Sequence, residues 1–365
     1  SIERERQEAM FRKIEKENPF EEILDQIIEN IKEGTLKKGD ALIVFSKKSV
    51  LALAAHLENQ GVRCSVIYGS LPPATRREQV RRFLERETEV VVSTDAIGMG
   101  LNLPIRRIVF VETRKFDGTS RRSLLPEEIR QIAGRAGRFG LYEEGFVTAI
   151  DDIETIEDGL SARPLPIMKA YVGFPEQLLS LPADIDTLVK IWAGMEAPAI
   201  YEKMEVDELL SLYMSFEHIH REHMEEFSKQ EIYKLITCSV DIDNKLVMEL
   251  WRDYCREYRG AEELEFPYHP GPDLYDMESY YKMLDLYFQF SRKVGLPVKE
   301  EELSLERRHT EEEISRILRT ECASYTRKCS ICSRELSWDY PFSICERCFE
   351  QGRSARPGGR RGRRG

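Results

Sequence analysis

The alternation of apolar and amphipathic stretches divides the chain into two regions with different periodicity. In the first region, short apolar runs rich in β-branched residues occupy positions 41–46, 65–72, 90–93 and 107–112. Such runs are typical of strands that are buried on both faces. The stretch 48–60, between the first two runs, has helical spacing instead. Strands that alternate with helices predict an α/β fold with a parallel sheet.

In the second region, from residue 166 to 320, apolar residues recur at helical spacing and strand-like runs are scarce. The segment with Leu188, Val189 and Trp192 is one example. We therefore expect an all-α region after the sheet domain. Tyrosine and phenylalanine are frequent between residues 254 and 290. At helical spacing a packed core is the favoured interpretation for them, and stacking on bases is the alternative.

A polar loop follows the third apolar run. Residues 94–104 read Thr-Asp-Ala-Ile-Gly-Met-Gly-Leu-Asn-Leu-Pro. A strand that ends in Ser/Thr-Asp and glycines predicts a tight loop at the carboxyl end of that strand. Open α/β sheets bind their ligands at this end. This loop is therefore a candidate ligand-binding segment.

A second candidate segment is the octet Gln-Ile-Ala-Gly-Arg-Ala-Gly-Arg at residues 131–138. Arg135 and Arg138 each present a planar fork of donors suited to phosphate oxygens. The small residues between them let the backbone approach a ligand closely. This combination favours an arginine finger, which stabilises charge on a transferring phosphoryl group. A surface turn with two solvated arginines is the alternative.

Taken in order, residues 94–104 and 131–138 resemble motifs V and VI of superfamily 2 helicases, of DExH type. The particular residues of both segments resemble those of the RNA helicase of the mitochondrial degradosome and its bacterial relatives. The run 41–46 resembles motif IV, and 65–79 resembles the strand and helix that come next. The resemblance covers roughly residues 41 to 150. It implies the second RecA-like domain of a helicase, with ATP and RNA as ligands.

The resemblance also implies roles for individual residues. On the ATP side, Arg135 and Arg138 reach the γ-phosphate, and Gln131 orders the loop or the attacking water. The cofactor-binding residues expected near ATP are Gly98, Gly100, Asn102 and Gly134. On the RNA side, the residues expected to hold phosphates are Ser46 and Thr94, joined by Arg76 and Arg77. Arg76, Arg77, Arg81 and Arg82 are spaced to form a stripe, for which a solvated helix face is the alternative.

The chain lacks two elements that an ATPase needs. We find no Gly-x-x-x-x-Gly-Lys-Ser/Thr and no Asp-Glu-x-His box in the expected order. The phosphate cradle and the carboxylates that hold Mg²⁺ are therefore expected in a first RecA-like domain that precedes this chain. On this interpretation the chain is the carboxyl-terminal half of a helicase and is inactive alone. The rival hypotheses are a non-catalytic zinc-dependent RNA-binding adaptor and a DNA helicase fragment.

Expected partners follow from the same resemblance. They are RNA, either single-stranded or a 3′-tailed duplex, the first RecA-like domain, and a nuclease. A membrane is not expected, because no apolar run approaches the ~20 residues of a span. We expect a cytoplasmic location of the bacterial type, with the mitochondrial matrix as the alternative.

The net charge of −11 is unevenly distributed. Residues 1–165 carry 26 basic and 28 acidic residues, residues 166–321 carry 18 and 33, and residues 322–365 carry 10 and 4. The acidic excess is therefore concentrated in the middle of the chain. The total charge therefore does not decide whether the chain binds RNA. The local basic segments decide that question.

Four cysteines near the carboxyl end have metal-ligand spacing. Two Cys-x-x-Cys pairs, Cys329 with Cys332 and Cys345 with Cys348, are separated by twelve residues. Each pair can deliver two thiolates to a tetrahedral Zn²⁺. A disulfide pair is the alternative, but the chain shows no secretory signs. We therefore expect a small zinc ribbon.

The last fourteen residues contain six arginines and no acidic residue, including Arg360 and Arg361. This composition cannot bury a core and predicts a disordered Arg/Gly tail that contacts RNA phosphates. A solubilising tail is the alternative. The expected organisation is a charged amino-terminal helix (1–18), the RecA-like domain (19–165), a helical accessory domain (166–321), the zinc ribbon (322–351) and the tail (352–365).

Overall fold

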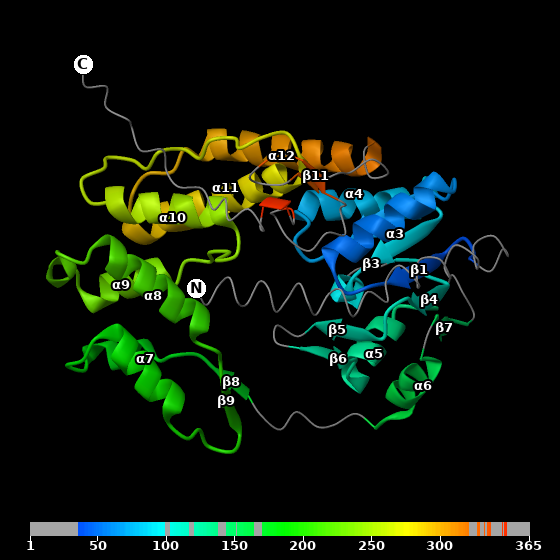
Figure 1. The fold of residues 1–365 in the computed structure, drawn as a ribbon, viewed down its shortest axis with the longest axis horizontal. Helices are drawn as coiled ribbons and strands as arrows, with labels where there is room; N and C mark the ends of the chain where they lie inside the picture. Colours follow the sequence, from blue (N-terminus) through cyan, green and yellow to red (C-terminus); the bar gives the residue numbers. More distant parts are fainter. Residues whose placement is uncertain are drawn as a thin grey trace. The chain divides into compact units, whose positions relative to one another are not determined.

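The structure is a computed structural model that divides into two compact units (Figure 1). One unit contains Ser1–Pro164 with Leu318–Gly365, and the other contains Leu165–Ile317. The residues described are 36–98, 103–116, 120–137, 144–150, 152–163, 170–320, 327–328, 332, 334–336, 345 and 347–348. The expected amino-terminal helix and the Arg/Gly tail lie outside the described residues.

The first unit is built on a five-stranded parallel sheet (Figure 1). Its strands are β1 (Asp40–Ile43), β2 (Cys64–Ile67), β3 (Val90–Ser93), β4 (Arg107–Phe110) and β7 (Phe146–Ala149). Their order in the sheet is β2-β3-β1-β4-β7, and every pairing is parallel. Parallel neighbours need crossover connections, which the intervening helices supply. The predicted α/β fold with a parallel sheet is confirmed.

Among the described residues, five helices accompany this sheet. They are α3 (Lys47–Asn59), α4 (Pro73–Leu84), the short 3₁₀ helix η1 (Asp95–Gly98), α5 (Pro126–Ala133) and α6 (Ile153–Ser161). The hydroxyl of Ser46 caps α3 by accepting the backbone N–H of Ser49 at 3.0 Å. Proline occupies the first position of α4 and α5, where its missing N–H costs no hydrogen bond.

Helices α5 and α6 pack closely because of one glycine. A Cβ on Gly159 would lie 2.4 Å from Cδ1 of Ile129, so a side chain there would separate the two helices. Arg130 reinforces the contact by donating to the carbonyls of Gly159 at 3.2 Å and Ala162 at 2.6 Å. The apolar face of α5, with Ile129 and Ile132, belongs to the buried core under the sheet. Helix α5 is therefore held firmly on the side opposite its polar residues.

A short antiparallel hairpin interrupts the α/β pattern between β4 and α5. Its strands are β5 (Arg114–Phe116) and β6 (Arg121–Ser123). Both have exposed or half-buried side chains, and Phe116 is 62% exposed. The sequence pattern did not predict this hairpin, because its strand residues other than Phe116 are polar and its strands are only three residues long.

The second unit is mostly helical, as expected. It contains η2 (Glu176–Ser180), α7 (Ile185–Gly194), α8 (Asp207–Ile219), η3 (Met224–Glu226), α9 (Lys229–Ile236), α10 (Lys245–Glu257), α11 (Leu274–Val294) and most of α12 (Glu300–Thr320). Two short parallel strands, β8 (Ala170–Val172) and β9 (Tyr201–Lys203), were not predicted. Tyr254, Tyr287 and Phe290 are at most 1% exposed, so the core interpretation is confirmed for these aromatic residues, whereas Tyr268 and Tyr275 are 59% and 43% exposed.

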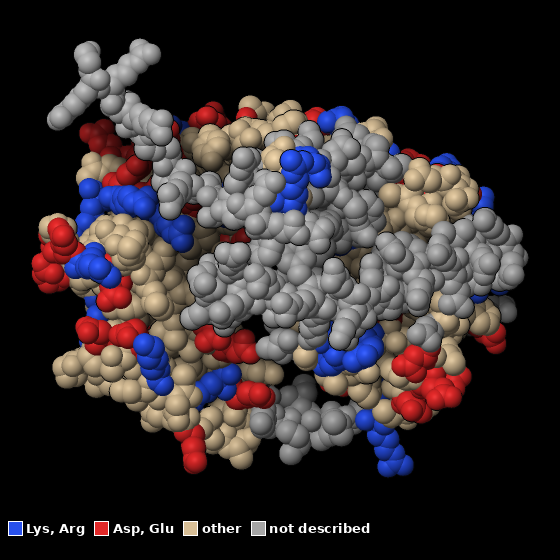
Figure 2. All heavy atoms as spheres, viewed as in Figure 1, with Lys and Arg blue, Asp and Glu red and all other residues tan. Residues whose placement is uncertain are grey.

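Charge on the described surface is mixed. On the face seen in Figure 2, basic and acidic side chains of the described residues are interspersed. The acidic excess of residues 166–321 is partly paired within the helical unit, for example Asp285 with Arg307 at 2.5 Å and Asp241 with Lys282 at 2.5 Å. Among the described residues, no helix is both long enough and apolar enough to cross a membrane.

Candidate functional site

The carboxyl ends of the central strands meet at one edge of the sheet. Ile43 of β1 lies opposite Ser93 of β3 and opposite Phe110 of β4, in parallel register. The residues that follow these strands, including Ser46 and Thr94, therefore lie at the same edge. We call this region the sheet edge. It is where the sequence predicted ligand contacts.

The two residues expected to hold RNA phosphates differ in environment. Ser46 is exposed at the amino-terminal end of α3, where backbone N–H groups point outward and favour an anion. The side chain of Thr94 is only 8% exposed, and its Oγ1 accepts the N–H of Ala96 at 3.2 Å. Ser46 thus presents its side chain to solvent, whereas the Thr94 hydroxyl organises the loop that begins η1.

The structure separates the four arginines that were expected to form a stripe on α4. Arg76 donates to the carbonyl of Gly69 at 3.0 Å, which ties α4 to the turn after β2. Arg81 binds three carboxylates, those of Glu78, Glu85 and Glu87. Arg82 is 9% exposed, and its burial lowers the pKa of the guanidinium. Arg77 is exposed. Within α4, Arg77 is the stripe arginine that most resembles a surface contact.

The motif V and motif VI segments meet through three residues that the sequence singled out. A Cβ on Gly98, at the end of η1, would lie 3.1 Å from Cγ of Gln131 on α5. The Nη2 of Arg135 donates to the carbonyl oxygen of Gly98. Gly98, Gln131 and Arg135 are therefore in mutual proximity, and only a residue without a side chain fits at position 98 without displacing Gln131. Gly134 is exposed at the carboxyl cap of α5.

The loop that carries Arg135 is fixed by a second glycine. Gly137 has φ +71°, and its N–H donates to the carbonyl of Ile105 at 3.0 Å. A Cβ on Gly137 would lie 2.5 Å from the backbone nitrogen of Gly145. A side chain there would meet both backbone strain and a backbone clash. The expected site residues Gly100, Asn102 and Arg138 lie outside the described residues.

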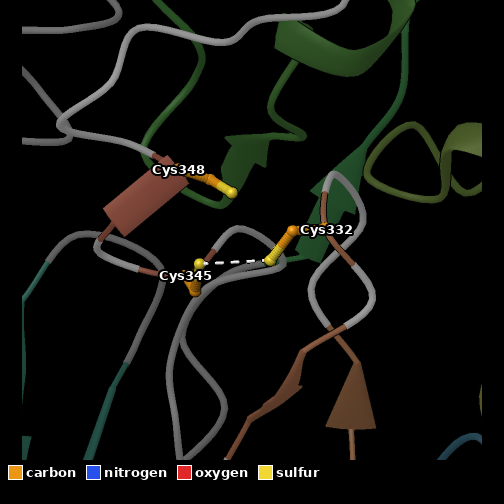
Figure 3. Close-up of side chains that lie close together, drawn as sticks. All are labelled: Cys332, Cys345 and Cys348. Carbon is orange, nitrogen blue, oxygen red and sulfur yellow. Dashed lines mark hydrogen bonds between the residues drawn. The ribbon is translucent and has the colours of Figure 1, made fainter.

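Three of the four predicted metal ligands form a cluster (Figure 3). The sulfur atoms of Cys332, Cys345 and Cys348 all lie within 4.8 Å of one another, and those of Cys332 and Cys345 are 3.6 Å apart. Four thiolates at ~2.3 Å from a tetrahedral Zn²⁺ are about 3.8 Å from each other. The observed spacing fits this geometry and is too long for a disulfide bond, whose sulfurs are ~2.05 Å apart. Cys329, Arg360 and Arg361 lie outside the described residues.

Comparison with known proteins agrees with these motifs. Residues 21–140 match the helicase conserved C-terminal domain. The chain is 31% identical over 286 residues to DExH-box ATP-dependent RNA helicase DExH16, mitochondrial, of Arabidopsis thaliana, covering 72% of this chain and 49% of the relative. The chain resembles the C-terminal half of a superfamily 2 RNA helicase of the mitochondrial degradosome type.

Two further relatives extend this helicase resemblance. ATP-dependent RNA helicase SUV3, mitochondrial, of Saccharomyces cerevisiae is 30% identical over 300 residues, covering 72% of this chain and 40% of the relative. ATP-dependent RNA helicase SUPV3L1, mitochondrial, of Gallus gallus is 30% identical over 298 residues, covering 74% and 36%. The chain thus spans about half, or less, of the length of the relatives it matches. Helicase resemblance extends past the sheet into the helical unit.

Solved structures give weaker similarity. The C-terminal domain of the DEAD-box protein Dbp5 has 17% identity and a TM-score of 0.32, covering 51% of this chain and 84% of that chain. S. cerevisiae Dbp5 bound to RNA and ADP BeF3 has 16% identity and a TM-score of 0.32, covering 52% and 40%. Scores at this level add nothing to the strand order and register, on which the fold assignment rests.

Proposed function

We propose that this chain is the second half of an ATP-dependent RNA helicase, and that it supplies one wall of the ATP site and one wall of the RNA groove. The observation that carries the proposal is the meeting of Gly98, Gln131 and Arg135 beside the sheet edge. These residues come from two segments that are more than thirty positions apart and that both match helicase motifs.

On the ATP side, the role of the motif VI segment is charge stabilisation. The guanidinium of Arg135 is half-buried and holds a carbonyl oxygen, which a phosphate oxygen would replace as acceptor. Together with Arg138 it would stabilise the negative charge that develops on the γ-phosphate, and Gln131 would orient the attacking water. Gly98, Gly100, Asn102 and Gly134 would line the nucleotide. Mg²⁺ would be held mainly by the first RecA-like domain.

On the RNA side, the sheet edge would bind the backbone of the strand. Ser46 and the first turn of α3 offer a hydroxyl and outward N–H groups to a phosphate. Thr94 would contribute through the loop that it organises, and Arg77 through its exposed guanidinium. To bind RNA, Arg76 would have to give up its hydrogen bonds to backbone carbonyls. An RNA contact by Arg76 would therefore cost more free energy than one by Arg77.

The cysteine cluster favours a second function, the binding of one zinc ion. Cys332, Cys345 and Cys348 would hold Zn²⁺ as thiolates, with Cys329 as the fourth ligand by its Cys-x-x-Cys spacing. The metal would stabilise a ribbon around the two-stranded pair β10 (Arg327–Lys328) and β11 (Glu335–Leu336). The ribbon and the tail that contains Arg360 and Arg361 would then capture RNA.

Location and partners follow from the relatives. Their names describe mitochondrial proteins, which favours the mitochondrial matrix for this chain, and no finding supports the cytoplasmic expectation. A first RecA-like domain is the required partner, and a nuclease is a further one. The same names favour RNA over DNA as the substrate.

The test of this function is RNA-stimulated ATP turnover by the full-length protein that carries the first domain. Arg138→Ala should lower turnover by a factor on the order of 10³, and Arg135→Ala should be similarly damaging. Arg138→Lys should rescue poorly, because a point charge cannot replace a bidentate fork. ATP binding should suffer less than turnover, since the fingers act on charge that develops in the transition state. Near-normal turnover in Arg138→Ala would contradict the arginine-finger assignment, whereas absence of turnover in the unmutated protein would favour the non-catalytic adaptor.

A further inference from the structure

The β5–β6 hairpin has no part in the proposed function so far, yet its basic residues bind the motif V segment and the motif VI helix directly and reach the motif IV segment through Glu112. The hairpin follows β4 directly and precedes α5, which carries Gln131. Lys115 on β5 and Arg121 and Arg122 on β6 each bind a carboxylate outside the hairpin. The base of the hairpin is therefore anchored to its surroundings on several sides.

The first anchor joins the hairpin to the motif IV segment. Glu112, at the end of β4, is 8% exposed. Its carboxylate accepts the backbone N–H of Phe45 at 2.7 Å and an Nη2 donor of Arg121 at 2.9 Å. Burial raises the pKa of Glu112, although both hydrogen bonds oppose the rise. Because Phe45 immediately precedes Ser46, strand β6 is connected through one side chain to the proposed phosphate contact.

The second anchor joins the hairpin to the motif VI helix. Both oxygens of Glu128 accept from Arg122 at 2.9 Å, and one oxygen also lies 2.5 Å from Nζ of Lys115. The same carboxylate accepts the backbone N–H of Leu125 at 2.8 Å and so caps α5. Burial alone raises the pKa of Glu128, but the bonds from Arg122, Lys115 and Leu125 outweigh it and hold the pKa at about 2.

The third anchor reaches the motif V segment. Nζ of Lys115 lies 3.4 Å from the carboxylate of Asp95, the first residue of η1. Helix η1 ends at Gly98, which contacts Gln131 and accepts from Arg135. Lys115 therefore bridges the beginning of η1 and the first turn of α5. The end of η1 meets α5 at a second place, through Gly98.

Helical geometry relates Glu128 to the proposed catalytic side chain. Gln131 lies three residues after Glu128 on α5, so the two side chains share one face of the helix. A displacement of Glu128 by the hairpin would turn or tilt this first turn and move Gln131 relative to Gly98. The opposite face of α5 is packed against α6 through Gly159, which leaves rotation about that contact as the accessible movement.

We propose that Glu128 is a positioning residue that couples the hairpin at the sheet edge to Gln131 and Arg135 on the ATP side. The inference rests on the proposed function, because it assigns to Glu128 the transmission of RNA binding to ATP turnover. Glu128 touches neither ligand and acts through the first turn of α5.

Glu128→Gln in the full-length protein tests this coupling. Glutamine keeps the length of the side chain and can still accept the N–H of Leu125, but it loses the charge that holds Lys115 and Arg122. The ratio of RNA-saturated to RNA-free ATP turnover should fall about tenfold. The KM for ATP and the RNA concentration at half-stimulation should change less than about twofold, since no ligand contact is removed.

The helical unit offers a matched control in Glu231→Gln. Glu231 is also the third residue of its helix, α9, and also binds both sides of an arginine fork, that of Arg259, at 3.1 and 2.8 Å. It also accepts hydrogen bonds from the backbone of the capping residue Ser228 and from the hydroxyl of Tyr258. If loss of a capping carboxylate were itself the cause, the ratio of RNA-saturated to RNA-free ATP turnover should fall in both variants. If coupling is lost, the ratio should fall only in Glu128→Gln.

Two further measurements decide the interpretation. Lys115→Met should reproduce the effect, and the double variant Lys115→Met, Glu128→Gln should lose no more than the more damaging single one, because both remove the same link. Should Glu128→Gln fold poorly, Lys115→Met carries the same test. An unchanged ratio in both single variants, or equal losses in Glu128→Gln and Glu231→Gln, would overturn the coupling. Absence of RNA stimulation in the unmutated protein would instead overturn the proposed function together with it.

Discussion

The two units of the molecule use equivalent local chemistry for different ends. Glu128 and Glu231 are both capping carboxylates in the third position of a helix, and both bind an arginine through two oxygens. The partners of Glu231, Tyr258 and Arg259, belong to the surrounding helical core and its edge. The side-chain partners of Glu128 belong to a hairpin that also contacts motif segment V and is linked through Glu112 to motif segment IV.

This comparison shows what distinguishes a site from a scaffold. In the helical unit, large aromatic side chains such as Trp251 and Phe290 fill the interior. In the sheet unit the core includes Ile, Val and Phe on short strands, and polar residues gather where those strands end. The polar groups of the sheet unit are arranged across segments distant in sequence, and this arrangement produces the candidate site.

Metal removal should have the largest effect, because the cysteine segment is too short to fold on a hydrophobic core of the kind found in either unit. We expect about one zinc per chain, and structural zinc in comparable small domains contributes roughly 10–16 kcal/mol to folding. Chelation should therefore unfold the segment around Cys345 and Cys348 while leaving the five-stranded sheet and the helical unit folded. Elemental analysis with hydrogen exchange checks this. A zinc content near zero, with Cys329 and Cys332 in a disulfide, would contradict it.

Core truncations should next separate the two units. Trp251→Ala in α10 and Phe110→Ala in β4 each remove a side chain that is 0% exposed, and such changes cost about 3–5 kcal/mol. Trp251→Ala should accelerate exchange in α8 to α11, and Phe110→Ala should do so in β1 to β4. Native-state hydrogen exchange measures both. Equal acceleration everywhere would show that the two units unfold as one and would break the comparison.

Glycine substitutions should then have opposite signs in the two units. Gly137→Ala places a Cβ in a left-handed conformation against Gly145 and should destabilise by at least about 1–2 kcal/mol. Gly194→Ala, at the end of α7, meets no atom within 4 Å and should be neutral or stabilise by up to about 1 kcal/mol. Denaturant titration of each unit compares them. Destabilisation by Gly194→Ala as large as that by Gly137→Ala would contradict the tight packing assigned to the motif VI loop.

The elements of the structure differ in how well the sequence alone predicted them. Strands β1 to β4 were predictable because buried parallel strands are continuous apolar runs. Gly98, Gln131 and Arg135 were identified by motif spacing, and the structure brings them together. The hairpin was missed because its strands are short and polar, and its order depends on ion pairs made with residues elsewhere in the chain.

The arginines of α4 are distinguished by contacts with residues nearby in the sequence. On α4, Arg76, Arg77 and Arg81 look equivalent in sequence. Two of the three carboxylates that Arg81 binds, those of Glu78 and Glu85, stand at helical spacing from it, whereas the fold is needed to show that Arg76 meets the carbonyl of Gly69. The signal for Glu128 was equally hidden, since a capping glutamate is common at a helix start whatever it binds afterwards.

The smallest predicted effect concerns the Arg/Gly tail. Deletion of residues 352–365 should weaken RNA binding and flatten its salt dependence, by about 0.7 in the log–log slope for each lost phosphate contact with single strands. ATP turnover at saturating RNA should change little, because residues 352–365 are separate in sequence from the motif segments. Titrations at several salt concentrations measure the slope. An unchanged affinity and slope would leave the tail as a solubilising segment.

The most direct test of the central claim compares ATP turnover, with and without RNA, by this chain alone and by the same chain joined to its native first domain. The chain's sequence contains no Gly-x-x-x-x-Gly-Lys-Ser/Thr and no Asp-Glu-x-His box in the expected order, so on the proposed function turnover should be negligible in both conditions. The joined protein should hydrolyse ATP, and RNA should accelerate it. Turnover by the isolated chain, or a joined protein that ignores RNA, would contradict the account.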